Sequence, residues 1–204
     1  MQFARYDQKR KLSGLIYFQR ISDPRFGVKS VLYLRMFQKL CGLQAYKNVV
    51  VLTTFWDQVT HEIGARQEAQ LMLSVFAELV EGGAKFIRHD NTVESTRKVL
   101  SHIFPMPPTI TQIQTEMGKE GKSLSETSVG AVLSKEVEQG IANYKKEIDD
   151  LKATMAAIEK SNNAARQELE MDLVMLQDLL DAREWEHAKL KGSWRRFLSP
   201  DSLR

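Results

Sequence analysis

A polar loop placed to hold a ligand follows one short apolar run. Residues 49–53 read Val-Val-Val-Leu-Thr, which is typical of a buried strand, and the polar loop 54–57 follows directly. A helical stretch comes next. Ligands of open α/β sheets bind where the carboxyl ends of the strands meet the loops, so loop 54–57 is a candidate ligand-binding loop.

A second polar loop follows a second candidate strand. Residues 84–87 are short and apolar, and residues 88–92 read Arg-His-Asp-Asn-Thr. These residue types form turns and cap helices, and either Asn91 or Thr92 is placed to cap the helix that follows. Taken by itself, the loop is interpreted as a turn that starts a helix.

The first half of the chain alternates strands with helices. Strands are expected at residues 12–21, 49–53 and 84–87, with turn residues at 22–27. Alternation of this kind favours a parallel sheet with right-handed crossovers, so the predicted fold class is α/β. The expected helices begin at Ser30, Thr60 and Thr92 and end near Gly42, Val80 and Phe104. Their inward residues at helical spacing are Val31, Leu34, Phe37, Leu40, Cys41, Ile63, Leu71, Val75, Phe76, Leu79, Val99, Leu100 and Ile103.

The second half has a different pattern. The proline-rich run 105–108 ends the α/β part, and a short helix is expected at residues 109–118. A long helix is then expected from about Ser125 to Lys191, unbroken, with Asn162 setting the register of a coiled-coil seam. Such a stripe must be buried in a partner chain or on the α/β part. The seam consists of Val137, Ile141, Tyr144, Ile148, Leu151, Met155, Ile158, Leu169, Leu173, Leu176 and Leu180.

These patterns divide the chain into four expected parts. Residues 1–104 form the α/β part, 105–124 a proline-rich linker with a short helix, 125–192 the coiled coil and 193–204 a tail. The net charge of +3 is too small to indicate a nucleic-acid partner. A single cysteine, no signal-peptide pattern and no apolar run of membrane-spanning length predict a cytoplasmic protein without a transmembrane segment.

Other familiar motifs fail on spacing. Residues 118–123 (Gly-Lys-Glu-Gly-Lys-Ser) imitate a phosphate-binding loop, but Glu116 stands where the first glycine is required, and a helix precedes the segment. This segment is therefore expected to be a hinge. The histidines and Cys41 show no metal-ligand spacing, so no metal-binding residues and no catalytic residues are assigned.

Several separated motifs together resemble one protein family. They are Gly-Leu-Ile-Tyr-Phe-Gln-Arg-Ile-Ser-Asp-Pro-Arg-Phe-Gly at 14–27, Leu-Arg-Met-Phe at 34–37, Leu-Cys-Gly at 40–42, Val-Leu-Thr-Thr-Phe-Trp-Asp at 51–57, the loop 88–92, and Gly-Lys-Ser-Leu-Ser-Glu-Thr at 121–127. In this order they resemble the later half of fungal P-loop G-domain proteins, relatives of GIMAP and septin-like GTPases. The resemblance covers about residues 14–130.

The resemblance implies a partial P-loop-type sheet and a site for GTP or GDP. Loop 54–57 matches the guanine-specificity motif, in which the carboxylate of Asp57 accepts hydrogen bonds from the base and Phe55 replaces the usual lysine. Thr54 either braces the loop or simply ends the strand, and the alternative for Asp57 is an ordinary loop residue or a helix cap before Val59. Loop 88–92 matches the second base-contacting loop, with His89 and Asn91 lining the pocket. The family's phosphate loop and magnesium motif precede the strand that here begins at residue 12, so magnesium is expected only if that half is supplied.

Two functions are therefore expected. The first is that of a truncated or degenerate GTPase that keeps the guanine-recognition half and lacks independent hydrolysis, because phosphate and metal contacts stabilise the transition state. The alternative is a non-catalytic module that pairs through its seam with another copy of itself or with another coiled-coil protein.

Overall fold

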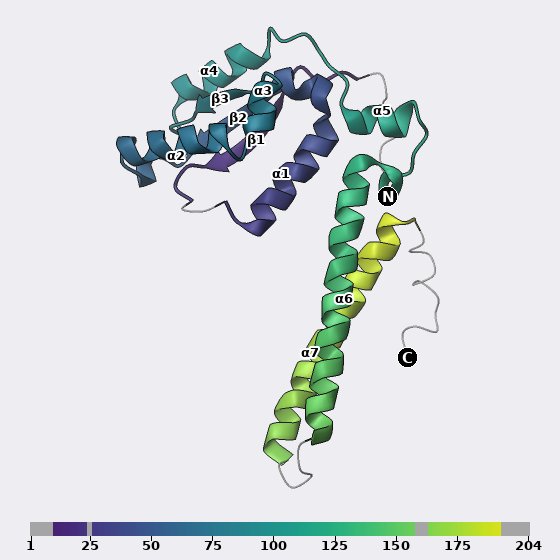
Figure 1. The fold of residues 1–204 in the computed structure, drawn as a ribbon. Helices are drawn as coiled ribbons and strands as arrows, with labels where there is room; N and C mark the ends of the chain where they lie inside the picture. The colour runs from purple at the N-terminus through teal and green to yellow at the C-terminus, as the bar shows by residue number, and fades with distance from the viewer. Residues whose placement is uncertain (1–9, 24–25, 158–162, 193–204) are drawn as a thin grey trace. The chain divides into compact units, whose positions relative to one another are not determined.

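The computed structural model describes residues 10–23, 26–157 and 163–192, of which residues 163–165 are described by their backbone alone (Figure 1). The chain divides into two compact units, Met1–Lys122 and Ser123–Arg204.

The first unit contains a parallel sheet with the strand order β1-β2-β3 (Figure 1). Strand β1 spans Leu15–Arg20, β2 spans Val49–Thr54 and β3 spans Lys85–Arg88. Each strand is followed by helices, as expected for parallel neighbours that need crossover connections. The predicted α/β class with a three-stranded parallel sheet is confirmed.

Helices cover both faces of the central strand. Val49 and Val51 pack with α1 (Val28–Cys41) and α3 (Ala77–Glu81), while Val50 and Leu52 pack with α4 (Val93–Ile103). Residues 49–51 are fully buried. A strand covered on both faces requires a continuous apolar run, which explains why β2 was recognisable in the sequence.

The helix predicted from Thr60 to Val80 is not continuous, so that prediction is wrong. The chain forms α2 (His61–Leu73) and α3 as separate helices, and the backbone turns at residues 74–76. The Gln70 carbonyl near the end of α2 accepts both from the Ser74 amide at 3.0 Å and from the Ser74 hydroxyl at 2.6 Å. Phe76 beyond the break is fully buried, so core packing favours the turn over a straight helix.

Three further details differ from the sequence expectation. Gly27, and not Ser30, is the N-cap of α1, because the helix begins at Val28. Ile63 and Leu100 were expected to face inward, yet each is 40% exposed. In both α2 and α4, the surface that packs against the core is narrower than the row of apolar residues on the helix. Val31 is also exposed, at 53%.

Helix α5 (Gln112–Gly118) closes the first unit. Thr111 and Gln114 form a capping box at its start, in which the Gln114 side chain accepts from the Thr111 amide at 2.9 Å. Leu12 and Thr109 form an isolated antiparallel bridge, so Leu12 precedes β1 instead of belonging to it as predicted. The buried Asn48 amide donates to the Ser13 carbonyl at 2.8 Å and anchors this connection.

The second unit is a helical hairpin. Helices α6 (Ser128–Ala157) and α7 (Asn163–Leu190) lie side by side (Figure 1). They are antiparallel, because contacts further along α6 lie earlier along α7: Glu138 contacts His187 at 3.0 Å, and Lys145 contacts Glu184 at 2.7 Å. The predicted unbroken helix is therefore wrong, and α6 covers the apolar stripe of α7 within one chain.

Seam positions meet inside this hairpin. Val137, Ile148 and Leu176 are buried, and Lys145 pairs with Glu184 across the helices at 2.7 Å. Seam position Ile158 and the predicted register residue Asn162 lie outside the described residues. In the described parts of the chain, no helix is long and apolar enough to cross a membrane.

Candidate functional site

The two predicted ligand loops leave neighbouring strands at one edge of the sheet. The His89 amide donates to the Thr53 carbonyl at 2.8 Å, and the Ile21 amide donates to the Thr54 carbonyl at 2.9 Å. The ends of β1, β2 and β3 are therefore hydrogen-bonded to one another. This edge brings loop 54–57 beside loop 88–92, as parallel pairing requires.

Loop 54–57 has a fixed and unusual backbone. Phe55 adopts the left-handed conformation with φ of 60°, and a 3-10 turn spans Trp56–Gln58. The Trp56 indole nitrogen donates toward Thr53, with its hydroxyl oxygen at 3.1 Å and its carbonyl oxygen at 3.2 Å. A left-handed aromatic residue is strained and persists only where the surroundings hold it, and such strain concentrates at functional sites.

Arg20 from the end of β1 holds the exposed side of this loop. Its guanidinium carbon lies 4.1 Å from the centre of the Phe55 ring, a cation–π contact. It also donates to the Gln58 side chain at 3.3 Å and lies 3.6 Å from Asp23. The Phe55 ring remains 43% exposed, so it forms a surface platform that Arg20 orients.

A buried carboxylate supports the loop from beneath. Glu68 of α2 is 9% exposed and accepts from the Thr53 hydroxyl at 3.2 Å and from Arg88 Nε at 2.8 Å. Arg88 in turn lies over the Trp56 ring, 4.2 Å from its centre. One carboxylate thereby ties the end of β2 to the end of β3, with the loop side chain stacked on the arginine.

Sequence reasoning missed Arg20, Glu68 and Arg88. The position of Glu68 carries a usable signal, because it lies four residues after the buried Gly64 and three before Leu71, on the packed face of the helix. A charged residue at such a position needs a partner. Nothing in the sequence identifies that partner as Arg88.

The carboxylate of Asp57 has no polar partner among the described residues. It lies exposed within the 3-10 turn and forms no hydrogen bond or ion pair with any described residue. Thr54 ends β2, which is one of its two expected roles, and its hydroxyl donates across to the Gln19 carbonyl at 3.4 Å. The loop is braced by Trp56 and Arg20 instead.

Loop 88–92 does start a helix, and Thr92 is the cap. The Ser95 amide donates to the Thr92 hydroxyl at 3.1 Å, while Asn91 is left-handed with φ of 63°. The Asp90 carboxylate accepts from the Thr92 hydroxyl at 2.6 Å, and hydrogen bonds from Thr92 and Ser95 lower the Asp90 pKa to about 2. His89 Nδ1 lies 2.7 Å from the Ser95 hydroxyl oxygen, which fixes the orientation of its ring.

A groove of about 390 Å³ lies beside this edge. It is lined by the end of β1 and by α2, including Gln19, Asp23, Gln67 and Ser74, and none of the residues predicted to bind ligand lines it. Thr54, Phe55, Asp57, His89 and Asn91 therefore form an open surface near the groove and not its wall.

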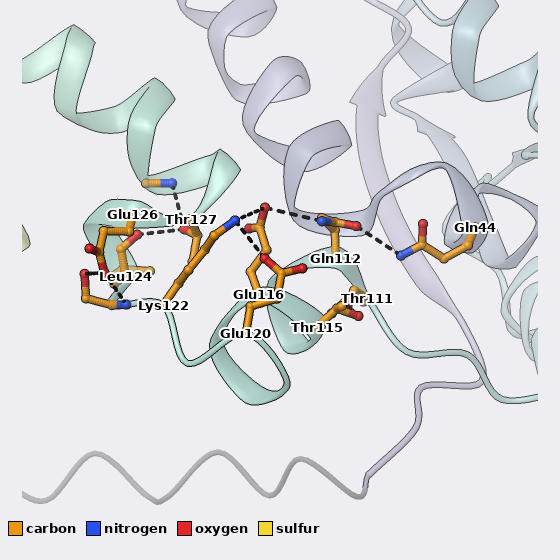
Figure 2. A network of polar contacts seen from close by, with 12 residues as sticks. Gln44, Thr111, Gln112, Thr115, Glu116, Glu120, Lys122, Leu124, Glu126 and Thr127 are labelled. Carbon is orange, nitrogen blue, oxygen red and sulfur yellow. Dashed lines mark hydrogen bonds and ion pairs between the residues drawn. The ribbon is translucent and has the colours of Figure 1, made fainter.

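The segment that imitates a phosphate-binding loop has a different role. It follows α5, not a strand, and Lys122 pairs with Glu120 at 2.8 Å and with the buried Glu116 at 3.8 Å (Figure 2). Gln112 also donates to Glu116 at 3.3 Å and accepts from Gln44 at 3.4 Å (Figure 2). Lys122, the residue that would have to contact a phosphate, is thus already paired with two carboxylates. Among the described residues, no cluster of His, Cys, Asp and Glu could hold a metal ion.

No family model, no curated protein and no solved structure matches this chain. The likeness to G domains therefore rests on the quoted sequence motifs.

Proposed function

We propose that the first unit recognises a guanine base at the carboxyl edge of its sheet, as the base-binding half of a G domain does. The observation that carries the proposal is the free carboxylate of Asp57 on a rigidly braced turn. A carboxylate accepts two parallel hydrogen bonds, and guanine offers two adjacent N–H donors on one edge. The adenine edge lacks that pair, so the same carboxylate gives selectivity.

Phe55 supplies the second element of the proposed site. An exposed aromatic ring is a stacking platform for any base, and stacking contributes about 1–3 kcal/mol per base. Because Arg20 already orients the ring, little side-chain entropy remains to be lost on binding. The expected lysine of the family motif is absent, so stacking on phenylalanine replaces its contact.

The second loop supplies polar groups next to these two. His89 has a fixed ring and Asn91 a fixed backbone, since Ser95 and the helix cap hold the loop. The Asp90 carboxylate already accepts a hydrogen bond from the Thr92 hydroxyl, so Asp90 is not part of the proposed base contact. This arrangement supports His89 and Asn91 as groups beside the base, while Asp57 provides its specificity.

Hydrolysis is not part of the proposal. The lysine-bearing segment 118–123 is committed to ion pairs with Glu116 and Glu120, so these residues do not support phosphate binding. Phosphate and magnesium contacts, when supplied, would add affinity and the chemistry of phosphoryl transfer. The residues described here account for recognition of the base.

A titration with fluorescent GDP tests the proposal. We expect saturable binding of the intact chain, competition by guanosine but not by adenosine, and little change on adding magnesium. Asp57→Ala should weaken binding at least tenfold, whereas the control Asp149→Ala, an exposed carboxylate on α6, should leave it unchanged. Equal competition by both nucleosides, or unchanged binding in Asp57→Ala, would contradict the proposal.

The alternative function, pairing of chains through the seam, has less support. Seam positions of α6 already face α7 in the same chain, so a partner would have to displace one helix. Sedimentation at several concentrations tests this alternative. A monomer at all concentrations with an intact helical spectrum excludes it.

A further inference from the structure

Helix α7 has a second apolar face that the hairpin does not cover. The side chains involved are 40–67% exposed: Met171, Val174, Met175, Leu179 and Trp185. We call these five the α7 stripe. Leu173 and Leu176 face α6, and a residue two positions earlier lies about 200° round the helix, so Met171 and Val174 point away from α6, whereas Met175 lies at the border with it.

Carboxylates accompany the α7 stripe. Helix α7 carries seven Asp and Glu residues against three Lys and Arg residues, although the whole chain has a net charge of +3. Five of these carboxylates are exposed and form no ion pair with any described residue, namely Glu168, Glu170, Asp172, Asp178 and Asp181. An uncovered apolar row with unpaired acids beside it is complementary to an apolar row with basic flanks.

A groove continues the α7 stripe toward α6. It has a volume of about 390 Å³ and combines apolar Leu151, Met175 and Leu176 with the carboxylates Glu147, Asp150 and Asp172. Met175 belongs to both the groove and the stripe. A long basic side chain suits this surface, because its carbon stem packs on apolar groups while its charge reaches the carboxylates.

From these contacts we propose that the α7 stripe is the docking surface for a basic amphipathic helix of another protein. The helix lays its apolar face along Met171, Val174 and Leu179, and its Lys or Arg residues pair with the flanking acids. Methionines adapt their shape to different partners, which suits such a surface. The inference does not depend on base recognition by the first unit.

The acidic charge of α7 disfavours two other binding partners for the α7 stripe. A second copy packed stripe to stripe would bring one acidic α7 against another, which is repulsive. An anionic membrane surface would likewise be repelled, since interfacial helices that bind membranes carry basic flanks. Only a partner of opposite charge satisfies the unpaired carboxylates.

The test uses the full chain and a synthetic helical peptide of about 18 residues, on the order of 27 Å long, with leucine on one face and lysine on the other. Fluorescence anisotropy of the labelled peptide measures its affinity. We expect saturable binding that weakens as salt is raised, because exposed ion pairs are screened. A matched peptide with glutamate in place of lysine should not bind.

Two double variants locate the binding surface. Met171→Lys with Val174→Lys should weaken binding at least tenfold. Gln139→Lys with Asn143→Lys adds the same charge to an exposed part of α6 and should weaken binding much less. Circular dichroism of both variants confirms that the hairpin remains folded.

Three results would overturn the proposal. One is equal loss of binding in the two double variants, which would show a general charge effect. Another is a dimer of the unmodified chain that disappears in Met171→Lys with Val174→Lys, since a second copy would then occupy the stripe. The third is capture of the chain by anionic phosphatidylserine vesicles that the same variant abolishes.

Discussion

Arg88 Nε donates to Glu68 Oε2 at 2.8 Å, and this pair joins the end of β3 to α2. The pair also reaches β2, because the Thr53 hydroxyl donates to the same carboxylate group. The carboxylate thus holds the strand end from which the Asp57 loop departs. Glu68 is 9% exposed, so it supports the proposed base-binding edge from beneath.

Glu68→Gln tests this support. The substitution keeps the size of the side chain but removes the charge that Arg88 contacts, so we expect the free energy of unfolding to fall by about 1–2 kcal/mol. The loss is small because the Arg88 side chain is 43% exposed and solvent weakens the pair. Urea denaturation measures the change, with Glu81→Gln as an exposed control expected to stay within about 0.5 kcal/mol. Equal midpoints for the two variants would contradict a supporting role.

Burial protects Cys41 from ionisation. It is fully buried, and burial raises the pKa of its thiol from 9.0 to about 12. Because the thiolate is the reactive form, an aromatic disulfide reagent at pH 8 should react far more slowly with the folded chain than with the chain in urea. Rapid reaction of the folded chain would show that the helix end opens.

The same shift gives a pH dependence of stability. Between about pH 9 and pH 12 the unfolded state releases a proton that the folded state retains, so the Cys41 contribution is complete below pH 9 and is lost as the pH rises. Denaturation at a series of pH values measures the slope. Cys41→Ala should flatten the slope in this window, and an unchanged slope would assign it to other groups.

Asp90 should titrate unusually low. Hydrogen bonds from Thr92 and Ser95 lower its pKa from 3.8 to about 2, so its contribution to stability is present above pH 3.8 and lost as the pH falls toward 2. Carboxyl chemical shifts measured by NMR follow this titration. Thr92→Val removes a donor and should move the pKa back up, whereas Thr96→Val should not. A pKa near 3.8 in the unmodified chain would show that the loop is open in solution.

Two glycines of α6 should respond oppositely to alanine. At Gly130 a Cβ would lie 1.8 Å from the Leu124 carbonyl oxygen, so Gly130→Ala must displace the turn that precedes the helix. At Gly140 a Cβ would lie 4.0 Å from Arg183 Nε, and Gly140→Ala should stabilise the helix by up to about 1 kcal/mol. Thermal unfolding followed by far-UV circular dichroism compares the two variants. A Gly130→Ala variant as stable as the unmodified chain would contradict the close approach.

The sequence by itself determined where β2 lies and which loop follows it. A strand buried on both faces needs a continuous apolar run, and residues 49–52 provide one, so the position of Asp57 at a strand end could be predicted. Alternation with helices determined the parallel pairing, which brings loops 54–57 and 88–92 to one edge. These features follow from local composition and chain order.

Tertiary structure alone decided what covers each apolar face. Periodicity shows that α6 and α7 have apolar stripes, yet it does not distinguish a partner chain from the neighbouring helix, and here the neighbour covers the seam. Likewise, the structural role of Glu68 follows only from the fold, which places Arg88 and Thr53 around its carboxylate. Contacts between residues distant in sequence depend on packing and charge pairing in three dimensions, which a one-dimensional pattern does not contain.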